Sequence, residues 1–239
     1  MKVLITGGAR GIGKSISEVF AKNGYDLCIN YNKSEKEALL LQKELQDLYD
    51  IKVKLIKADL SDLSSINDLY QNLKTLYPDG VDILINNSGV CIDEVFDKVE
   101  FEKVQKLYNI NLLSVIELTR LIISDMIKKK SGSIINISSV SGVLGCSCEV
   151  DYSTTKAAIN GFTKALAKEV GESNIKVNAV APGIIKTDMT CDLDEEYCLS
   201  NIPLHRYGSA NEVAKLVYDI SQNKYITGQI IGIDGAIII

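Results

Sequence analysis

The sequence predicts a single doubly wound α/β domain, in which a parallel sheet carries helices on both faces. Short apolar runs alternate with amphipathic segments of helical length along the whole chain. The apolar runs are continuous, as is typical of parallel strands that are buried on both faces. No linker, repeat or low-complexity tract divides the chain, so we expect one domain over residues 1–239.

Seven segments are predicted as strands because each is a short apolar run with polar or glycine residues at its ends. They are Lys2–Thr6, Asp26–Asn30, Lys52–Lys57, Ile83–Asn86, Ser133–Ser138, Lys176–Ala181 and Gln229–Ile233. Helices are expected at Gly13–Lys22, Glu35–Leu48, Ser61–Leu76, about Phe101–Lys129, a segment that carries Tyr152 and ends near Val170, and Asn211–Ser221. In the helix that ends near Val170, the expected apolar stripe is Ile159, Phe162, Leu166 and Val170.

Composition excludes several classes of function. The net charge of -5, with the two signs interspersed, argues against nucleic acid as the main partner, because binding phosphates needs a basic face. No apolar run approaches the ~20 residues of a membrane span, and the chain begins directly with a strand, so we expect a cytoplasmic protein. The six cysteines lack zinc-site spacing and there is one histidine, so we expect free thiols and no metal site.

A glycine-rich turn follows the first strand and indicates a dinucleotide site. It reads Thr6-Gly7-Gly8-Ala9-Arg10-Gly11-Ile12-Gly13, so its glycines follow the pattern G-x-x-x-G-x-G. Glycines let a backbone turn tightly and approach a pyrophosphate, whose charge is favoured at the N-terminus of the next helix. A glycine-rich turn without a ligand is the weaker alternative.

The end of the second strand indicates which dinucleotide is bound. An NAD site places an acidic residue here for the ribose 2′-hydroxyl, but none occurs before Glu35. Asn32 and Lys33 follow the strand instead, and Arg10 lies in the glycine-rich turn. These cations suit a 2′-phosphate, so the prediction is NADP(H).

Polar residues follow the other strands, at the edge of the sheet where ligands bind. Asp59 and Leu60 are candidates for the adenine, although Asp59 is equally consistent with a helix cap. The remaining candidates at this edge are Asn87, Ser88, Gly89, Ser138, Ser139, Pro182, Gly183 and Thr187.

Tyr152 and Lys156 lie four residues apart, so they share one face of their helix. A phenol has a pKa of about 10, and a cation beside it favours the phenolate and lowers that pKa. The pair is therefore a candidate proton-transfer device.

The chain resembles the short-chain dehydrogenase/reductase family over nearly its whole length. The resemblance rests on Thr6-Gly7-x-x-x-Gly11-Ile12-Gly13, Asn86-Asn87-Ser88-Gly89, Asn111, Ser139, Tyr152-x-x-x-Lys156, and Pro182-Gly183 with Thr187. Within the family it is most similar to the bacterial β-ketoacyl-[acyl-carrier-protein] reductase branch, judged by Asn30-Tyr31-Asn32, Pro182–Thr190 and Ile226-Thr-Gly-Gln229. The resemblance implies a Rossmann-like domain with strand order 3-2-1-4-5-6-7 and a substrate lid at about 184–208.

The resemblance also implies roles for the residues. Tyr152 would protonate a carbonyl oxygen as hydride arrives, Ser139 would hydrogen-bond that oxygen, and Lys156 would lower the pKa of Tyr152 and bind the nicotinamide ribose. Asn111 would hold a water that links Lys156 to solvent. The nicotinamide would contact Pro182, Gly183, Ile185 and Thr187, and the expected reaction is reduction of a 3-oxoacyl thioester on carrier protein or coenzyme A.

Some residues depart from the family's pattern. Ser88 replaces an alanine, and Asp151 precedes the tyrosine where asparagine is common. Of two basic positions expected to dock an acidic carrier protein, Lys130 occupies one, but Ser173 occupies the other, beside Glu172. By resemblance we also expect a homotetramer or homodimer formed through the two long helices and the C-terminal strand.

Three other functions are weaker. A dehydrogenase of a small alcohol, sugar or steroid would use the same residues. A hydrolase triad would depend on His205, which falls in the lid away from any nucleophile turn. A dinucleotide-binding regulator without catalysis would not need Asn111, Ser139, Tyr152 and Lys156 together.

Overall fold

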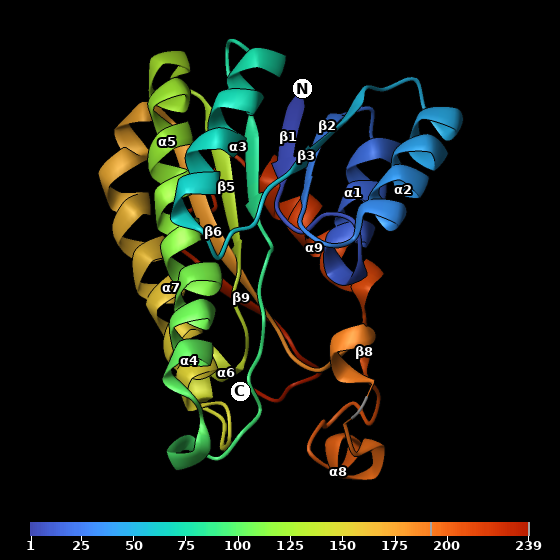
Figure 1. Cartoon of the computed structure of the whole chain (residues 1–239), viewed down its shortest axis with the longest axis vertical. Helices are drawn as coiled ribbons and strands as arrows, with labels where there is room; N and C mark the ends of the chain where they lie inside the picture. Colours follow the sequence, from blue (N-terminus) through green and yellow to red (C-terminus); the bar gives the residue numbers. More distant parts are fainter. Residues whose placement is uncertain (192, 239) are drawn as a thin grey trace.

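The computed structural model describes residues 1–191 and 193–238. Within them, a parallel sheet of seven strands has the order β3-β2-β1-β4-β5-β6-β9, which confirms the predicted fold (Figure 1). The strands are β1 (Lys2–Ile5), β2 (Asp26–Tyr31), β3 (Val53–Lys57), β4 (Ile83–Asn86), β5 (Gly132–Ile137), β6 (Ile175–Pro182) and β9 (Ile230–Ile233). Because all of them are parallel, their carboxyl ends meet at one edge of the sheet, which is where ligands bind in such folds.

Helices cover both faces of the sheet (Figure 1). One face carries α1 (Gly11–Lys22), α2 (Glu35–Leu48) and α9 (Ala210–Gln222). The other carries α3 (Leu63–Leu76), α5 (Ser114–Lys129) and α7 (Val150–Val170). Each layer closes over its own cluster of buried apolar side chains, so the sheet is buried on both sides, as its continuous apolar strands require.

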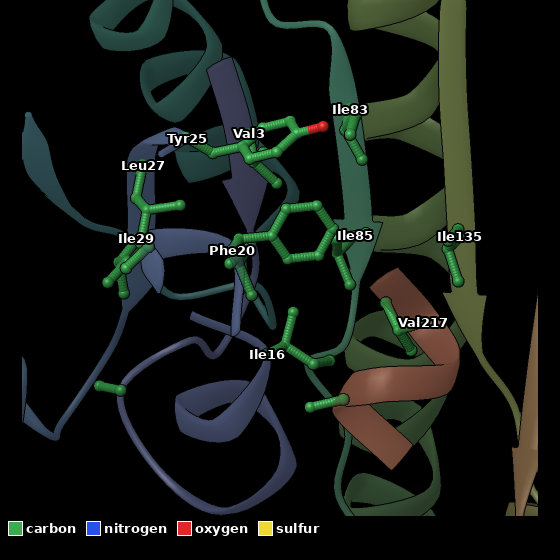
Figure 2. Close-up of a cluster of buried hydrophobic side chains, with 14 of the residues drawn as sticks. Val3, Ile16, Phe20, Tyr25, Leu27, Ile29, Ile83, Ile85, Ile135 and Val217 are labelled. Carbon is green, nitrogen blue, oxygen red and sulfur yellow. The ribbon is translucent and has the colours of Figure 1, made fainter. Parts of the chain in front are cut away.

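Phe20 of α1 lies at the centre of the first cluster (Figure 2). It is fully buried and points at the sheet between Ile29 of β2 and Ile85 of β4. Its ring meets Tyr25 and Tyr218 edge to face, with centroid distances of 5.2 and 5.3 Å. This packing joins α1 to α9 and fixes the helix that follows the glycine-rich turn.

The long helix predicted over about Phe101–Lys129 is interrupted. It consists of α4 (Phe101–Tyr108), a π-helical turn η2 (Asn109–Leu113) and α5. At the turn, the Ser114 N–H donates to the Asn109 carbonyl five residues back, and the Ser114 hydroxyl donates to the Ile110 carbonyl at 2.6 Å. Turns of this kind occur often at functional sites, and this one contains Asn111.

The segment predicted as irregular contains short elements. Parallel strands β7 (Ile185–Lys186) and β8 (Gly208–Ser209) pair with each other, and η4 (Asp188–Thr190) and α8 (Glu195–Ser200) lie between them. In Figure 1, α8 lies beyond the carboxyl ends of the strands, below α9. Asp192 of the predicted lid and Ile239 of the predicted domain lie outside the described residues.

The predicted apolar stripe of α7 is partly wrong. Ile159 and Val170 are buried, but Phe162 and Leu166 are only partly buried. Thr163 and Ala167 occupy the core positions instead. Thr163 is buried because its hydroxyl accepts a hydrogen bond of 2.9 Å from the Asn136 amide, a pairing that a hydrophobicity pattern does not reveal.

Three further elements complete the described chain. A short helix, α6 (Ser141–Leu144), was not predicted, η1 (Phe96–Lys98) precedes α4, and η3 (Gly171–Ser173) follows α7. Among the described residues, no helix has the length and apolar character that crossing a membrane requires.

Candidate active site

The loops after β1 and β4 are held together by Thr6 and Asn87. The Thr6 hydroxyl oxygen accepts from the backbone N–H groups of Asn87 and Ser88, at 2.9 and 3.0 Å. The Asn87 side-chain amide donates to the carbonyls of Thr6 and Gly7, at 2.9 and 3.2 Å. Two segments far apart in sequence, both predicted to bind cofactor, therefore form one rigid unit.

The glycine-rich turn has the geometry of an anion cradle. A Cβ atom added to Gly13 would lie 2.2 Å from the Gly7 carbonyl oxygen, so the backbone can fold this tightly only with glycine there. Gly7 and Gly11 have positive φ values of 61° and 50°, which glycine adopts without strain. Arg10, at the N-cap of α1, makes no side-chain cap, so the first N–H groups of the helix have no side-chain acceptor. These residues fit the pyrophosphate of a dinucleotide.

The residues predicted for the adenosine end lie at the tips of β2 and β3. The side chains of Asn32 and Asp59 are hydrogen-bonded to each other, and Lys33 is exposed. Asp59 also accepts from the N–H and hydroxyl of Ser61, at 2.9 and 2.7 Å, and these bonds lower the pKa of Asp59. Asp62, not Asp59, caps α3, while Leu60 is buried in the second apolar cluster.

Arg10 lies over the beginning of the lid. Its guanidinium is 3.8 Å from the Asp188 carboxylate, and both side chains are mostly exposed. Thr187 lies beside the turn, since a Cβ atom added to Gly11 would be 3.7 Å from its methyl group. Pro182 ends β6, where its carbonyl accepts from Val140 N–H at 3.0 Å. The beginning of the lid thus returns to the glycine-rich turn, while Pro182 lies against the segment that follows β5.

Tyr152 and Lys156 lie one turn apart on α7, beside the end of β5. The Lys156 ammonium is 5.5 Å from the centre of the Tyr152 ring and donates to the Ile137 carbonyl at 2.8 Å. Ser139 hydrogen-bonds the Tyr152 side chain. Ser138 points the other way, since its hydroxyl donates to the Asn160 side-chain oxygen at 2.7 Å. Of the two serines, only Ser139 faces Tyr152.

Burial dominates the electrostatics of this pair. It raises the pKa of Tyr152; the negative charge of Cys91, where that thiol is ionised, and that of the Glu149 carboxylate raise it further, and the hydrogen bond with Ser139 opposes the change. Burial also lowers the pKa of Lys156 to about 8. The phenol is therefore held neutral, in the form that can donate a proton. The lowering of the tyrosine pKa by Lys156 stays a prediction.

The π-helical turn brings Asn111 close to Lys156. Its amide group donates to the Val90 carbonyl at 2.8 Å, and its side-chain oxygen accepts from the Val90 N–H at 2.9 Å. A Cβ atom added to Gly89 would lie 3.4 Å from the Lys156 ammonium and 3.5 Å from the Asn111 oxygen. Asn111 thus fixes the loop after β4 against the π-helical turn, close to Lys156 of α7, and its water relay stays a prediction.

Three residues at this site were not predicted. Glu149, three residues before Tyr152, accepts a hydrogen bond of 2.8 Å from the Ser141 hydroxyl and one of 3.4 Å from the Cys91 thiol. The sequence drew attention to Asp151, but it is Glu149 that acts on Tyr152. No spacing rule marks the three residues, which belong to three different segments. Among the described residues, no group of three or more histidine, cysteine or acidic side chains could hold a metal ion.

The family model described as short chain dehydrogenase matches residues 1–197. The chain belongs to the short-chain dehydrogenase/reductase family. It is 40% identical over 237 residues to the 3-oxoacyl-[acyl-carrier-protein] reductase of Aquifex aeolicus (strain VF5), covering 97% of this chain and 95% of the relative. The corresponding reductase of Thermotoga maritima is 38% identical over 241 residues, covering 99% and 97%. Carbonyl reductase family member 4 of Xenopus laevis is 34% identical over 233 residues, covering 98% and 96%.

Membership of this family makes the chain an oxidoreductase that acts on CH–OH and C=O groups with a nicotinamide dinucleotide. The geometry agrees with this chemistry, because the glycine-rich turn and the Ser139–Tyr152–Lys156 group lie at the same edge of the sheet. The strand order and the resemblance to the family, both predicted from sequence, are confirmed.

Proposed function

We propose that this chain uses NADPH to reduce a 3-oxoacyl thioester, carried on acyl carrier protein or coenzyme A, to the 3-hydroxyacyl form. The observation that carries the proposal is that Ser139, Tyr152 and Lys156 lie together at the same edge of the sheet as the glycine-rich turn. The 3-oxoacyl substrate is supported by the names of the relatives from Aquifex aeolicus and Thermotoga maritima.

The chain's own residues would bind, orient and protonate. The cofactor supplies the hydride. The turn from Thr6 to Gly13, together with Asn87, Ser88 and Gly89, would hold its phosphates and ribose, and Lys156 would bind the nicotinamide ribose. Ser139 would hold the substrate carbonyl oxygen, and the neutral phenol of Tyr152 would donate its proton to that oxygen as it gains charge.

Tyr152→Phe tests the proton donor. We expect loss of turnover by at least ~100-fold with little change in NADPH affinity, because only the hydroxyl is removed. Tyr225→Phe is the control, since Tyr225 is 98% exposed. Turnover by Tyr152→Phe at the wild-type rate would contradict the assignment.

The preference for NADPH is proposed to rest on Arg10, in the glycine-rich turn, and Lys33, after β2, whose side chains are both exposed. Arg10→Ala should weaken NADPH binding by ~10-fold or more, as expected for a charge-assisted contact, and leave NADH binding nearly unchanged. Fluorescence titration with both cofactors measures this, with Lys36→Ala on the exposed side of α2 as control. Equal loss for both cofactors would rule out recognition of the 2′-phosphate.

The two positions expected to dock an acidic carrier protein lie side by side. The Asn174 side chain donates to the Lys130 carbonyl at 3.2 Å, so Lys130 and the Ser173 turn are neighbours. Both positions immediately precede strands, at the opposite edge of the sheet from Tyr152. A carrier protein that docks there would present its acyl group to the active site of another copy in an oligomer.

A comparison of acetoacetyl-coenzyme A with carrier-protein thioesters measures the substrate preference. Preference for the carrier form would support the fatty-acid role, in which case the protein is expected in the cytoplasm. Turnover of a small alcohol, sugar or steroid alone would support the alternative dehydrogenase function. Cofactor binding without turnover of any carbonyl would indicate a regulator.

A further inference from the structure

Glu149 occupies the N-cap of α7 but does not cap it. Its side chain makes no hydrogen bond to the first turn of the helix, although acidic residues are favoured there. It turns instead towards α6 and the loop after β4, where it accepts from the Ser141 hydroxyl at 2.8 Å and the Cys91 thiol at 3.4 Å. The Cys146 thiol also lies near it, and burial and then the Glu149 charge raise the pKa of that thiol. Two donors from separate segments therefore converge on one carboxylate.

The Ser141 contact leads directly to the reacting groups. Ser141 is buried, and its backbone N–H donates to the Ser139 hydroxyl oxygen at 3.1 Å. Ser139 in turn hydrogen-bonds Tyr152. With an acceptor position filled by this N–H, the hydroxyl of Ser139 keeps its own proton available for donation. The chain of contacts runs from Glu149 through Ser141 to Ser139 and Tyr152.

We propose that Glu149 is a positioning residue for carbonyl reduction, whose carboxylate anchors Ser141, orients Ser139 through it, and sets the charge that Tyr152 faces. This inference rests on the proposed function, because it assigns Glu149 to the reaction carried out by Ser139 and Tyr152. Glu149 itself does not need to touch the substrate.

The charge of Glu149 has a defined effect on the pH dependence. A carboxylate near a phenol disfavours the phenolate and so raises the pKa of Tyr152, which keeps the proton donor loaded at higher pH. Removing the charge should lower that pKa. Reduction would then fail at a lower pH, and alcohol oxidation, which needs the phenolate, would begin at a lower pH.

Few other titratable groups lie around Tyr152 and Glu149. Tyr152 faces Lys156 from its own helix, Cys91 from the loop after β4, and Glu149. Around Glu149 lie Cys91 and Cys146, and beyond them Asp93 and Cys148. The pKa of Cys91 is raised to about 12, first by burial and then by Glu149, so this thiol stays neutral over the range of the assay.

Three variants separate the two effects of Glu149. Glu149→Gln removes the charge and keeps an acceptor for Ser141, so the alkaline limb of kcat/KM that Tyr152 sets, above the one that Lys156 sets near pH 8, should move to lower pH by ~0.5–1 unit. Ser141→Ala breaks the anchor and keeps the charge, so kcat should fall ~10-fold at every pH with the limb unmoved. Glu149→Ala should show both changes. In the double variant with Ser141→Ala, the two losses of kcat should not add, because both substitutions break the same anchor.

Asp151→Asn is the matched control. It removes the same charge one residue from Tyr152, but Asp151 is half-buried near Glu94 and Phe96 and does not act on the phenol. Its pH profile should coincide with that of the wild type. A Glu149→Gln profile that also coincides with the wild type, or an equal shift in both variants, would overturn the proposal.

A second measurement does not depend on turnover. Because Glu149 raises the pKa of Cys91, Glu149→Gln should increase alkylation of Cys91 by iodoacetamide at pH 8.5 several-fold, read by peptide mass, and Asp151→Asn should not. Faster alkylation in a protein that reduces no thioester would overturn the proposed function and leave the anchor in place. Unchanged alkylation together with an unchanged profile in an active enzyme would overturn the anchor alone.

Discussion

Lys156 is buried, which disfavours its charged form, and this cost should appear in the free energy of unfolding. Its pKa is lowered from 10.5 to about 8, so between these values the unfolded chain binds more protons than the folded one. The unfolding free energy of the wild type should therefore rise between pH 8 and 10.5 by up to ~3 kcal/mol from this group. Urea unfolding of the wild type and of Lys156→Met at pH 7 and 9.5 measures it.

The comparison with Lys156→Met has a clear sign. The variant lacks the buried cation, so its advantage over the wild type should be largest at pH 7 and should shrink as pH rises through 8. A difference between the two proteins that is independent of pH would contradict the lowered pKa. Lys164→Met, on the exposed side of the same helix, should show no such dependence.

At the scale of single residues, the sequence predicted the site residues that follow a regular spacing and missed those that do not. Tyr152 and Lys156 follow helical periodicity, and the family's spacing selected Ser139, which the structure places beside Tyr152. Glu149 escaped because its partners, Ser141 and Cys91, come from other segments and meet it only in the folded chain. Asp151 was noticed because it adjoins the tyrosine, but adjacency along a helix does not make two side chains face each other.

At the scale of elements, the contact between α6 and α7 fixes the helix that carries Tyr152 and Lys156. A Cβ atom added to Gly142 would lie 2.6 Å from the Lys156 carbonyl carbon and 2.7 Å from its Cβ atom. Gly142→Ala should therefore force the two helices apart, lower stability by ~1–3 kcal/mol and reduce kcat. Thermal unfolding and steady-state kinetics measure the two effects.

Gly171→Ala is the control for this prediction. Gly171 has helical dihedral angles, and a Cβ atom added there meets nothing within 4 Å. It should be neutral or stabilise by up to ~1 kcal/mol, since alanine restricts the unfolded chain. Equal losses in the two variants would mean that glycine flexibility, not close packing, explains Gly142.

Regular elements were predicted well because their signals are local. The helix Glu35–Leu48 and the strand Ile83–Asn86 have the predicted bounds. The π-helical turn at Asn109–Leu113 was missed because nothing in the local pattern distinguishes it from an α-helix; the Ser114 hydroxyl and the clamp on Val90 stabilise it. The lid elements were missed because they are only two to six residues long.

At the scale of the whole molecule, we predict that copies of this chain associate. β9 pairs only with β6 among the described strands, and α7 exposes Ala157, Gly161 and Ala165 on its outer side. We expect light scattering to give a mass of four chains, or two. Ala165→Glu should shift this mass towards one chain, because it buries a charge if two α7 helices meet.

Leu40→Glu provides the comparison for association. Leu40 is an apolar residue that is 70% exposed on α2, on the other side of the sheet. It should leave the mass unchanged. A monomeric wild type, or dissociation by both variants alike, would contradict assembly through the long helices.

The position of β1 between β2 and β4 has a consequence for synthesis in the cell. Leu4 pairs with Cys28 on one side, but its partner on the other side, Leu84, is made 80 residues later. At a translation rate of ~5–20 residues per second, that edge of β1 waits ~4–16 s for its neighbour. During this interval the nascent chain presents an apolar, unpaired strand, the feature that promotes aggregation. The yield of folded protein on rapid expression should therefore depend on temperature and chaperones more strongly than the stability of the finished sheet would suggest.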